Sequence, residues 1–282
     1  MNLRPKQIGS NFRTGAIVIH LLLIVTCILI FFPLLWMLST SFKQPDEVFT
    51  HEIRLIPHQP TFDNYAHVWT TTPFMRWILN SAITALGITL CQITTSLLAA
   101  YAFGYYDFKG KNVLFMITIG SIIIPFAVVM IPNYITIAKL KLLNTWWAVI
   151  LPYSVSGFGI FLLRQYILSF PRELFDAAKL DGSNSWSTLW RILAPLIKAP
   201  VFAICIVFFL DAWNMYFWPL LVLTKNETRT FSIGLQYFVD FEEGQDWGAF
   251  MSASTLGALP ALIAYIIAQK QIIRVYITSG LK

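Results

Sequence analysis

Six long apolar stretches dominate the chain, and each is long enough to cross a lipid bilayer. They cover approximately residues 15–38, 77–105, 113–135, 146–163, 199–223 and 247–268. A spanning helix needs about 20 mostly apolar residues, because the hydrocarbon core is about 30 Å thick and each helical residue rises about 1.5 Å. The pattern predicts an all-α polytopic membrane helix bundle with six transmembrane helices, organised as a single domain over residues 1–282.

The composition agrees with a membrane protein. Hydrophobic residues make up 57% of the chain and charged residues 12%, and the mean hydropathy is +0.65. Soluble domains carry about 25% charged residues, so a cytosolic enzyme, a disordered tail and a secreted disulfide scaffold are disfavoured. The three cysteines, Cys27, Cys91 and Cys205, lie in apolar runs, which favours packing over a disulfide framework or a metal site.

The distribution of charge predicts the orientation. An even number of spans places both termini on one side, and 13 of the 20 Lys and Arg residues fall on that side. Since cytoplasmic segments carry an excess of Lys and Arg, both termini are predicted to be cytoplasmic. Topology then explains the net charge of +6, and no nucleic-acid partner is expected. The first apolar run is too long for a cleavable signal and is predicted to be an uncleaved helix.

The second apolar run is unusually polar. Small residues recur at Ser96, Ala100 and Gly104, a spacing that lets two helices approach closely. Helix packing is therefore the favoured explanation for its polar residues. Gln92, near the middle of the run, is the better candidate for lining a substrate path, because its amide needs a hydrogen-bond partner.

The third apolar run contains two prolines, Pro125 and Pro132. Each lacks a backbone N–H and so removes one helical hydrogen bond. Both are predicted to kink the helix, which suits a bundle that rearranges but also occurs in static bundles.

The fifth run carries the only charge inside a predicted span, Asp211. An acid at the centre of a spanning helix costs about 2.5–3.5 kcal/mol on insertion scales, so its side chain should face protein or water. It is either a functional residue or a partner in an interhelical hydrogen bond. Asn214 and Tyr216 follow it and combine an amide with an aromatic ring, as sugar-binding walls do. Trp218 is expected at a membrane interface.

The segment between the fourth and fifth spans, residues 164–198, is not apolar enough to cross the membrane. Pro171 and Glu173 favour the start of a helix, and Gly182 favours its end. Ser183 or Ser185 is expected to cap a second helix. The segment therefore predicts a helix–turn–helix in the cytoplasm.

This cytoplasmic segment is rich in large apolar side chains. They are Phe175, Trp186, Leu189 and Trp190. They lie either against the chain's own bundle or lipid, or on a surface that docks a cytoplasmic partner.

The spacing Asp176-Ala-Ala-x3-Gly182-x9-Ile192-x2-Pro195 resembles the EAA coupling motif of permease subunits of ATP-binding-cassette importers. Two positions depart from that motif, since Asp176 replaces Glu and Ala194 replaces Leu. The chain resembles the maltose-transporter type, specifically the shorter six-span subunit. Further similarities lie at residues 99–103, 108–110, 161–165, 213–214, 219–220 and 269–270.

This resemblance implies a type I importer permease in the cell (inner) membrane, with a cytoplasmic coupling helix between helices 4 and 5. The implied partners are a homologous second permease, a homodimeric cytoplasmic ATPase that binds ATP and Mg, and an extracytoplasmic solute-binding protein. The implied cargo is a mono- or oligosaccharide or a related polyol phosphate. The implied ATPase-coupling residues are Glu173, Asp176, Ala177, Ala178, Asp181, Gly182, Ile192 and Pro195.

The chain itself is expected to be neither an enzyme nor a cofactor protein. It has no Gly-x4-Gly-Lys-Ser/Thr phosphate loop, and its histidines at 51, 58 and 67 lack metal-ligand spacing. By the resemblance, the outer loop 224–246 contacts the binding protein, and the alternative is a solvated loop. The tail 271–282 resembles the segment that runs toward the ATPases, but it is shorter than the family's usual glycine-rich ending. The alternative function is a proton- or ion-coupled secondary transporter that uses Asp211.

Overall fold

The computed structural model describes residues 11–49, 54–239 and 245–279, and the side chains of residues 15–49, 54–239 and 245–269. Every regular element in these ranges is helical. Within the described ranges, three helices are long and apolar enough to cross a membrane alone, Gly15–Thr40, Phe74–Tyr105 and Trp247–Gln269. Three bent helix pairs pass the same test, which gives up to six crossings. The all-α, polytopic prediction is confirmed, while the exact spans and the single-domain organisation stay predictions.

The described residues divide into two compact units, one from the ranges 11–71 and 238–256 and the other from the ranges 72–237 and 257–279. The first unit contains α1 (Asn11–Thr40), α2 (Pro45–Val48), α3 (Asp63–Thr71) and the start of α15 (Trp247–Ser279). Buried polar groups hold it together around Ser41. The amide of Asn64 donates to the carbonyls of Ser41 at 3.1 Å and Lys43 at 2.7 Å, and the hydroxyl of Ser252 donates to Ser41 at 3.0 Å.

Three helices form the body of the second unit, α4 (Phe74–Tyr105), α8 (Gly157–Leu168) and α12 (Lys198–Trp213). The predicted ladder of small residues lies between α4 and α8. Ser96 and Ala100 are fully buried, and a Cβ on Gly104 would lie 2.8 Å from the Ile167 side chain. A Cβ on Gly159 of α8 would lie 2.5 Å from the Ser96 hydroxyl. The spacing therefore correctly predicted a close helix approach.

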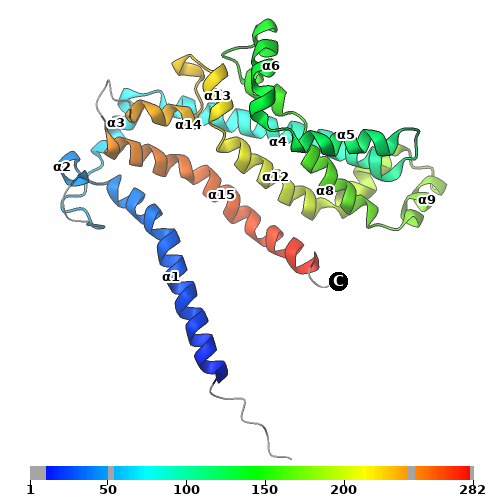
Figure 1. Cartoon of the computed structure of the whole chain (residues 1–282), viewed down its shortest axis with the longest axis horizontal. Coiled ribbons are helices and arrows are strands. Elements are labelled where there is room, and N and C mark those ends of the chain that lie inside the picture. The colour runs from blue at the N-terminus through cyan, green and yellow to red at the C-terminus, as the bar shows by residue number, and fades with distance from the viewer. Residues whose placement is uncertain (1–10, 50–53, 240–244, 280–282) are drawn as a thin grey trace, which may run out of the picture. The chain divides into compact units, whose positions relative to one another are not determined.

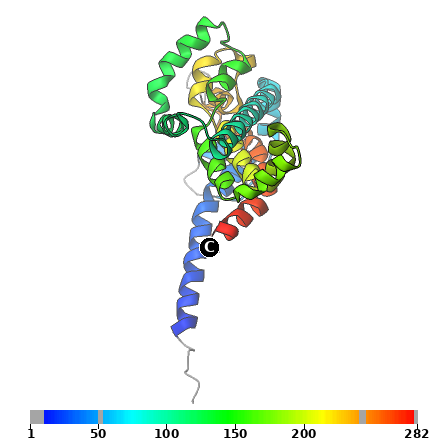
Figure 2. The same ribbon diagram turned by 90° about the vertical axis from the view of Figure 1, so that its right-hand side faces the viewer.

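The third apolar run is broken rather than kinked. α5 (Lys111–Ile123) and α6 (Phe126–Lys139) meet at 99°, with Pro125 at the break (Figure 1, Figure 2). Pro132 lies inside α6, which continues through it. The pair is therefore either a broken span or a re-entrant loop.

The fourth run also bends, by 47°, between α7 (Trp146–Ile150) with η1 (Leu151–Tyr153) and α8. We did not predict this bend. Ser156 lies at the break and caps α8, its hydroxyl accepting from the backbone N–H of Gly159 at 3.2 Å.

The fifth run is not one continuous helix. α12 ends at Trp213, and the short α13 (Phe217–Val222) follows after a turn. Before α12, the helix formed by α10 (Ser185–Ser187), η2 (Thr188–Leu193) and α11 (Ala194–Leu196) meets it at 82°. Asp211 therefore lies in the last turn of a helix and not at the helix centre that the sequence suggested.

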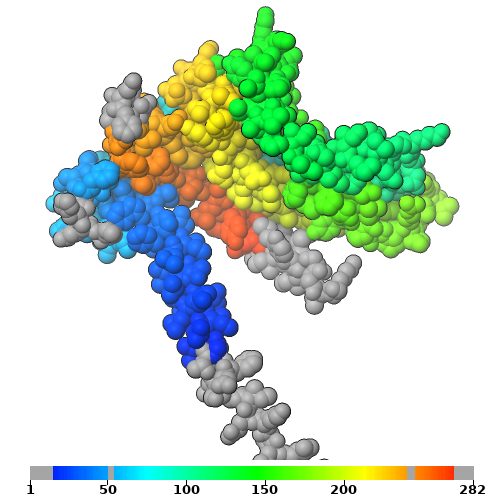
Figure 3. Space-filling view, viewed as in Figure 1, coloured from blue at the N-terminus to red at the C-terminus, as the bar shows by residue number. Residues whose placement is uncertain are grey.

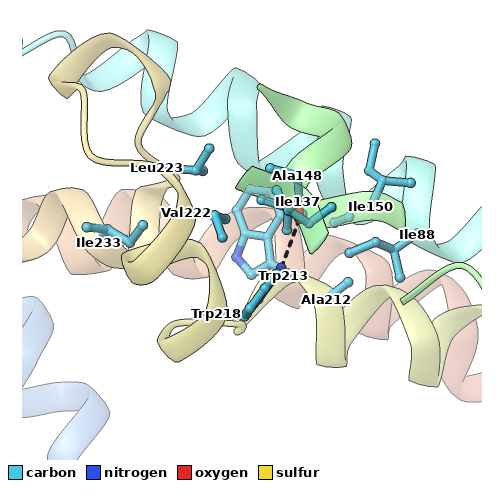
Figure 4. Packing of buried hydrophobic residues seen from close by; sticks show 12 residues of the cluster. Ile88, Ile137, Ala148, Ile150, Ala212, Trp213, Trp218, Val222, Leu223 and Ile233 are labelled. Atoms are coloured by element: carbon cyan, nitrogen blue, oxygen red, sulfur yellow. Dashed lines mark hydrogen bonds between the residues drawn. The ribbon is translucent and has the colours of Figure 1, made fainter. Parts of the chain in front are cut away.

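A hydrophobic cluster surrounds the two tryptophans that follow Asp211. Trp218 is fully buried, and its indole N–H donates to the carbonyl of Ala148 at 3.0 Å (Figure 4). Its ring also meets Phe126 of α6 edge-on at 5.7 Å, and α6 lies beside α13 (Figure 3). Trp218 is thus a core residue and does not face lipid as an interface tryptophan would, while its depth in the membrane stays a prediction.

Candidate functional site

The first helix of the cytoplasmic segment is α9 (Arg172–Leu180), and it ends as predicted at Gly182. Gly182 has φ +77°, a left-handed conformation that costs residues with a Cβ about 1–2 kcal/mol. Its N–H donates to Lys179 at 3.0 Å, and that of Ser183 donates to Ala178 at 2.9 Å. These two bonds satisfy carbonyls that a helix end leaves without partners.

The second helix is capped by a residue that the sequence analysis missed. The side-chain oxygen of Asn184 accepts from the backbone N–H of Ser187 at 2.8 Å. Ser183 instead pairs its hydroxyl with that of Thr188 at 3.0 Å, so neither predicted serine is the cap. Asn is as good an N-cap as Ser, and the sequence could have suggested it.

α9 is fastened to the end of α4 (Figure 1). The buried ring of Phe175 lies 5.0 Å from that of Tyr105, and the ammonium of Lys179 lies 5.2 Å from the same Tyr105 ring. At the other end of α9, the Arg172 guanidinium is 3.5 Å from the Asp107 carboxylate. Three contacts along its length thus hold α9 against the C-terminal end of α4 and the residues that follow it.

The Asp107 carboxylate is a pH-dependent part of this attachment. The hydrogen bond and charge of Lys111, and then the charge of Arg172, hold the pKa of Asp107 below its ordinary value. A depressed folded-state pKa means that the stabilisation is complete at neutral pH and is lost as pH falls through that lowered value.

Asp107→Asn is therefore expected to lower the melting temperature of the detergent-solubilised protein slightly at pH 7 and to have a smaller effect at pH 3. Asp181→Asn is the control, because Asp181 is also exposed but makes no ion pair within the described residues. Scanning fluorimetry at both pH values checks this. An equal effect of Asp107→Asn at pH 7 and pH 3 would show that its charge does not stabilise the fold.

The outward face of α9 and the residue that follows the helix carry four of the eight predicted coupling residues. Glu173, Asp176, Ala177 and Asp181 are exposed, but Ala178 is buried inside its own subunit. Of the two alanines, only Ala177 is therefore accessible to a partner, and contact with a partner stays a prediction. Further along, Ile192 is half-buried in η2 and Pro195 is exposed in α11.

The large apolar side chains of the segment divide into two groups. Phe175 and Leu189 are buried, whereas Leu180 is 89% exposed and Trp186 is 63% exposed. Trp186 packs edge-on against the exposed Trp190 at 5.7 Å, beside a shallow groove that begins at Gly182. The buried group therefore lies against the chain's own bundle, while docking of a cytoplasmic partner by the exposed group stays a prediction.

The opposite end of α4 holds a second polar network. The amide of Asn80 donates to the carbonyls of Glu227 and Arg229, each at 2.9 Å, and accepts from the indole N–H of Trp146 at 2.9 Å. Asn144, with φ +62°, accepts from the backbone of Thr224 at 2.7 Å. These asparagines fix the start of the outer loop. Sequence reasoning missed this role, because the pairs are more than 60 residues apart.

Asn80→Ala is expected to release this loop. It would remove three part-buried hydrogen bonds, those to the Trp146 donor and to two loop carbonyls, each of which contributes about 0.5–1.5 kcal/mol. Hydrogen–deuterium exchange of peptides covering residues 224–231 should accelerate, while exchange in α9 stays unchanged. Asn112→Ala, at an exposed position of α5, is the control. Unchanged exchange in the loop would show that other contacts hold it.

A cavity of about 310 Å³ lies beside the middle of α4. Its polar lining comes from Gln92, Asp211, Tyr153 and Ser156, with Phe158 and Phe208 among its apolar walls. The structure thus brings together two of the four predicted substrate-path residues, which lie 119 positions apart in the sequence.

The other two substrate-path candidates do not line this cavity. Asn214 turns its amide back onto its own helix and donates to Leu210 at 2.8 Å. Tyr216 is half-buried in the turn before α13. Tyr153 and Ser156, which do line the cavity, come from the unpredicted break in the fourth run.

A family model, "Binding-protein-dependent transport system inner membrane component", matches residues 92–276 of the chain. The chain belongs to this family. It is a permease subunit of an ATP-binding-cassette transport system, and none of the comparisons favours the ion-coupled alternative.

Curated relatives of this permease match almost its whole length. It is 34% identical over 254 residues to the arabinooligosaccharides transport system permease protein AraQ of Halalkalibacterium halodurans, covering 89% of this chain and 91% of the relative. It is 30% identical over 277 residues to the sn-glycerol-3-phosphate transport system permease protein UgpE of Yersinia pestis, covering 96% and 99%.

Solved structures support the same fold. One chain of a bacterial ABC transporter involved in the import of the acidic polysaccharide alginate superimposes with a TM-score of 0.80 at 22% identity, covering 96% of the permease and 99% of that chain. A chain of a bacterial alginate ABC transporter in complex with an alginate pentasaccharide-bound periplasmic protein gives a TM-score of 0.69 at 16% identity, covering 96% and 98%.

Some sequence predictions for the permease lie outside the described residues. They concern the acidic residues Asp240, Glu242 and Glu243 of the outer loop, His51, and the last three residues of the tail. Within the described ranges, no group of three or more His, Cys, Asp or Glu side chains is arranged to hold a metal ion.

Proposed function

We propose that this permease is one of two homologous membrane subunits of an importer that carries a mono- or oligosaccharide or a related polyol phosphate, driven by a homodimeric cytoplasmic ATPase. A solute-binding protein would deliver the cargo from outside. The carbohydrate class is supported by the relatives, whose names refer to arabinooligosaccharides and sn-glycerol-3-phosphate. ATP and Mg would be bound by the ATPase and not by this chain.

The observation that carries the proposal is the exposed, rigidly attached α9. Its outward face presents Asp176 and Ala177, and Gly182 ends it in open space, where a Cβ would meet nothing within 4 Å. A short side chain at Ala177 permits close approach of a partner, and Asp176 offers it a carboxylate. Glu173, Ala178, Asp181, Ile192 and Pro195 complete the proposed coupling element.

The structure suggests how movement of α9 would reach the cavity. α9 contacts α4 through Tyr105, and the chain leads from α9 through η2 and α11 into α12. These two helices carry Gln92 and Asp211, which line the cavity. When ATP closes the ATPase dimer, a shift of α9 would therefore act on both walls and favour one arrangement of the bundle over the other.

Orientation is part of the proposal. Asp107, Tyr105 and α9 lie together at one end of α4, and Asn80 with the loop 224–231 lies at the other end. The first end would be cytoplasmic, and both termini would be on that side, in agreement with the excess of Lys and Arg there.

A mild-detergent pull-down of the tagged chain, followed by mass spectrometry and an ATPase assay, tests the proposal. We expect one second permease and two ATPase copies for each copy of this chain, with ATPase activity in the eluate. A chain that purifies alone and transports in vesicles without ATP would reject the proposal and favour ion coupling through Asp211.

A further inference from the structure

The cavity beside the middle of α4 contains three polar groups that are not satisfied by the chain. The Gln92 amide, the Tyr153 hydroxyl and the Asp211 carboxylate make no hydrogen bond or ion pair within the described part of the protein. An amide both donates and accepts, a phenol does the same, and an ionised carboxylate only accepts. These groups need hydrogen-bond partners, so whatever fills the cavity has to be polar.

The electrostatic character of this cavity is negative. Asp211 is its only charged lining residue among the described side chains, and no Lys or Arg side chain lines it. Asp211 also lies in the last turn of α12, whose C-terminal end carries a partial negative charge from its aligned peptide dipoles. Both sources of charge have the same sign.

Asp211 cannot be explained as a lipid-facing residue. Its side chain is exposed in the isolated subunit, and a carboxylate is too costly to place in hydrocarbon. The cavity beside it therefore has to be occupied by water, by solute or by another polar surface. Its volume lies at the lower end of the range for small-molecule sites, and Phe158 and Phe208 supply the apolar walls that such sites have.

We propose that this cavity is a subsite of the substrate path that selects by charge, taking uncharged or cationic polyhydroxylated groups and rejecting phosphorylated and carboxylated ones. Hydroxyl groups would donate to Asp211 and exchange hydrogen bonds with Gln92 and Tyr153, while C–H faces would pack on the two phenylalanines. An anionic group would be repelled, since juxtaposed like charges are strongly unfavourable. This inference rests on the proposed function and narrows it by excluding polyol phosphates.

Charged thiol reagents test the sign of the electrostatic potential in the cavity, and they do not require the substrate to be known. In the full-length chain, with Cys27→Ser, Cys91→Ser and Cys205→Ala as background, Met215→Cys places a reporter in the cavity lining while the three polar groups are retained. Membranes of cells that also express the transporter partners are treated with a trimethylammonium-ethyl or a sulfonatoethyl methanethiosulfonate. Asn226→Cys, at an exposed position outside the cavity, corrects for the intrinsic rates of the two reagents.

We expect Met215→Cys to react roughly tenfold faster with the cationic reagent than with the anionic one, after division by the same ratio at Asn226→Cys. A cleft lined by one sign of charge concentrates counter-ions by such factors. Asp211→Asn should reduce the preference to near unity at Met215→Cys and leave Asn226→Cys unchanged. An unreactive Met215→Cys, or a preference that does not respond to Asp211→Asn, would overturn the inference. Failure of ATP-dependent transport would reject the proposed function instead, and the reagent ratio would remain measurable.

Discussion

Gly182→Asp is expected to reduce ATP-dependent uptake to the background of vesicles that lack the permease, while the chain remains inserted in normal amounts. The residue has φ +77°, where a side chain costs about 1–2 kcal/mol, so the end of α9 would be strained. A Cβ there meets no atom within 4 Å, so the fold itself has no steric reason to fail. The added carboxylate would also lie beside Asp181, on the surface that we assign to the ATPase.

Gly182→Asn is the matched control, since Asn has a similar size, no charge, and the same tolerance for the left-handed conformation as Asp, so that any backbone strain is common to both variants. We expect it to retain a substantial part of the uptake. ATPase activity of the purified complex separates uncoupling from loss of assembly, because an uncoupled complex still hydrolyses ATP. Uptake by Gly182→Asp at the wild-type rate would show that Gly182 has no role in coupling to the ATPase.

Gly257→Ala is expected to have the largest effect on stability. A Cβ at Gly257 would lie 1.8 Å from Cζ of Phe231, far inside van der Waals contact. Phe231 cannot retreat easily, because its backbone N–H donates to the buried Ser81 hydroxyl at 2.7 Å and its ring stacks on Trp213. Overpacking typically costs about 1–3 kcal/mol and occasionally more, and we expect the upper end here.

The thermal unfolding temperature of the purified protein should fall by several degrees or more in Gly257→Ala. Gly120→Ala is the control, since a Cβ at Gly120 in α5 meets nothing within 4 Å and alanine favours a helix. The double variant Gly257→Ala with Phe231→Leu should recover part of the loss, because the smaller side chain leaves room. Equal unfolding temperatures for Gly257→Ala and the original protein would contradict the close packing of this site.

Helix content and the end of α9 could be read from the sequence because they depend on local signals. Apolar runs, a ladder of small residues and a glycine at a helix end act through their nearest neighbours. The helix breaks were harder to predict from the sequence, because Pro125 and Pro132 have the same local effect. Each removes one backbone hydrogen bond. Tertiary packing decides whether the helix stops, as at Pro125, or continues, as at Pro132.

The cavity could be predicted only in part. Gln92 and Asp211 stood out because polar side chains are rare in spanning helices. Their proximity depends on how α12 packs along α4, and no local signal in either run specifies that packing. Tyr153 and Ser156 were missed because they enter the cavity through the 47° bend before α8. Hydrogen-bond networks such as that of Asn80 cannot be predicted from the sequence, because only the folded structure brings their distant partners together.

The two adjacent alanines of α9 should behave differently in genetic experiments, because one points out and the other is buried within the subunit. Second-site suppressors of a bulky residue at Ala177 would be found in another gene, the one that encodes the docking partner. Suppressors of the same change at Ala178 would be intragenic. The location of the suppressors therefore distinguishes a residue that contacts a partner from a residue that packs within the subunit, although the two codons are adjacent.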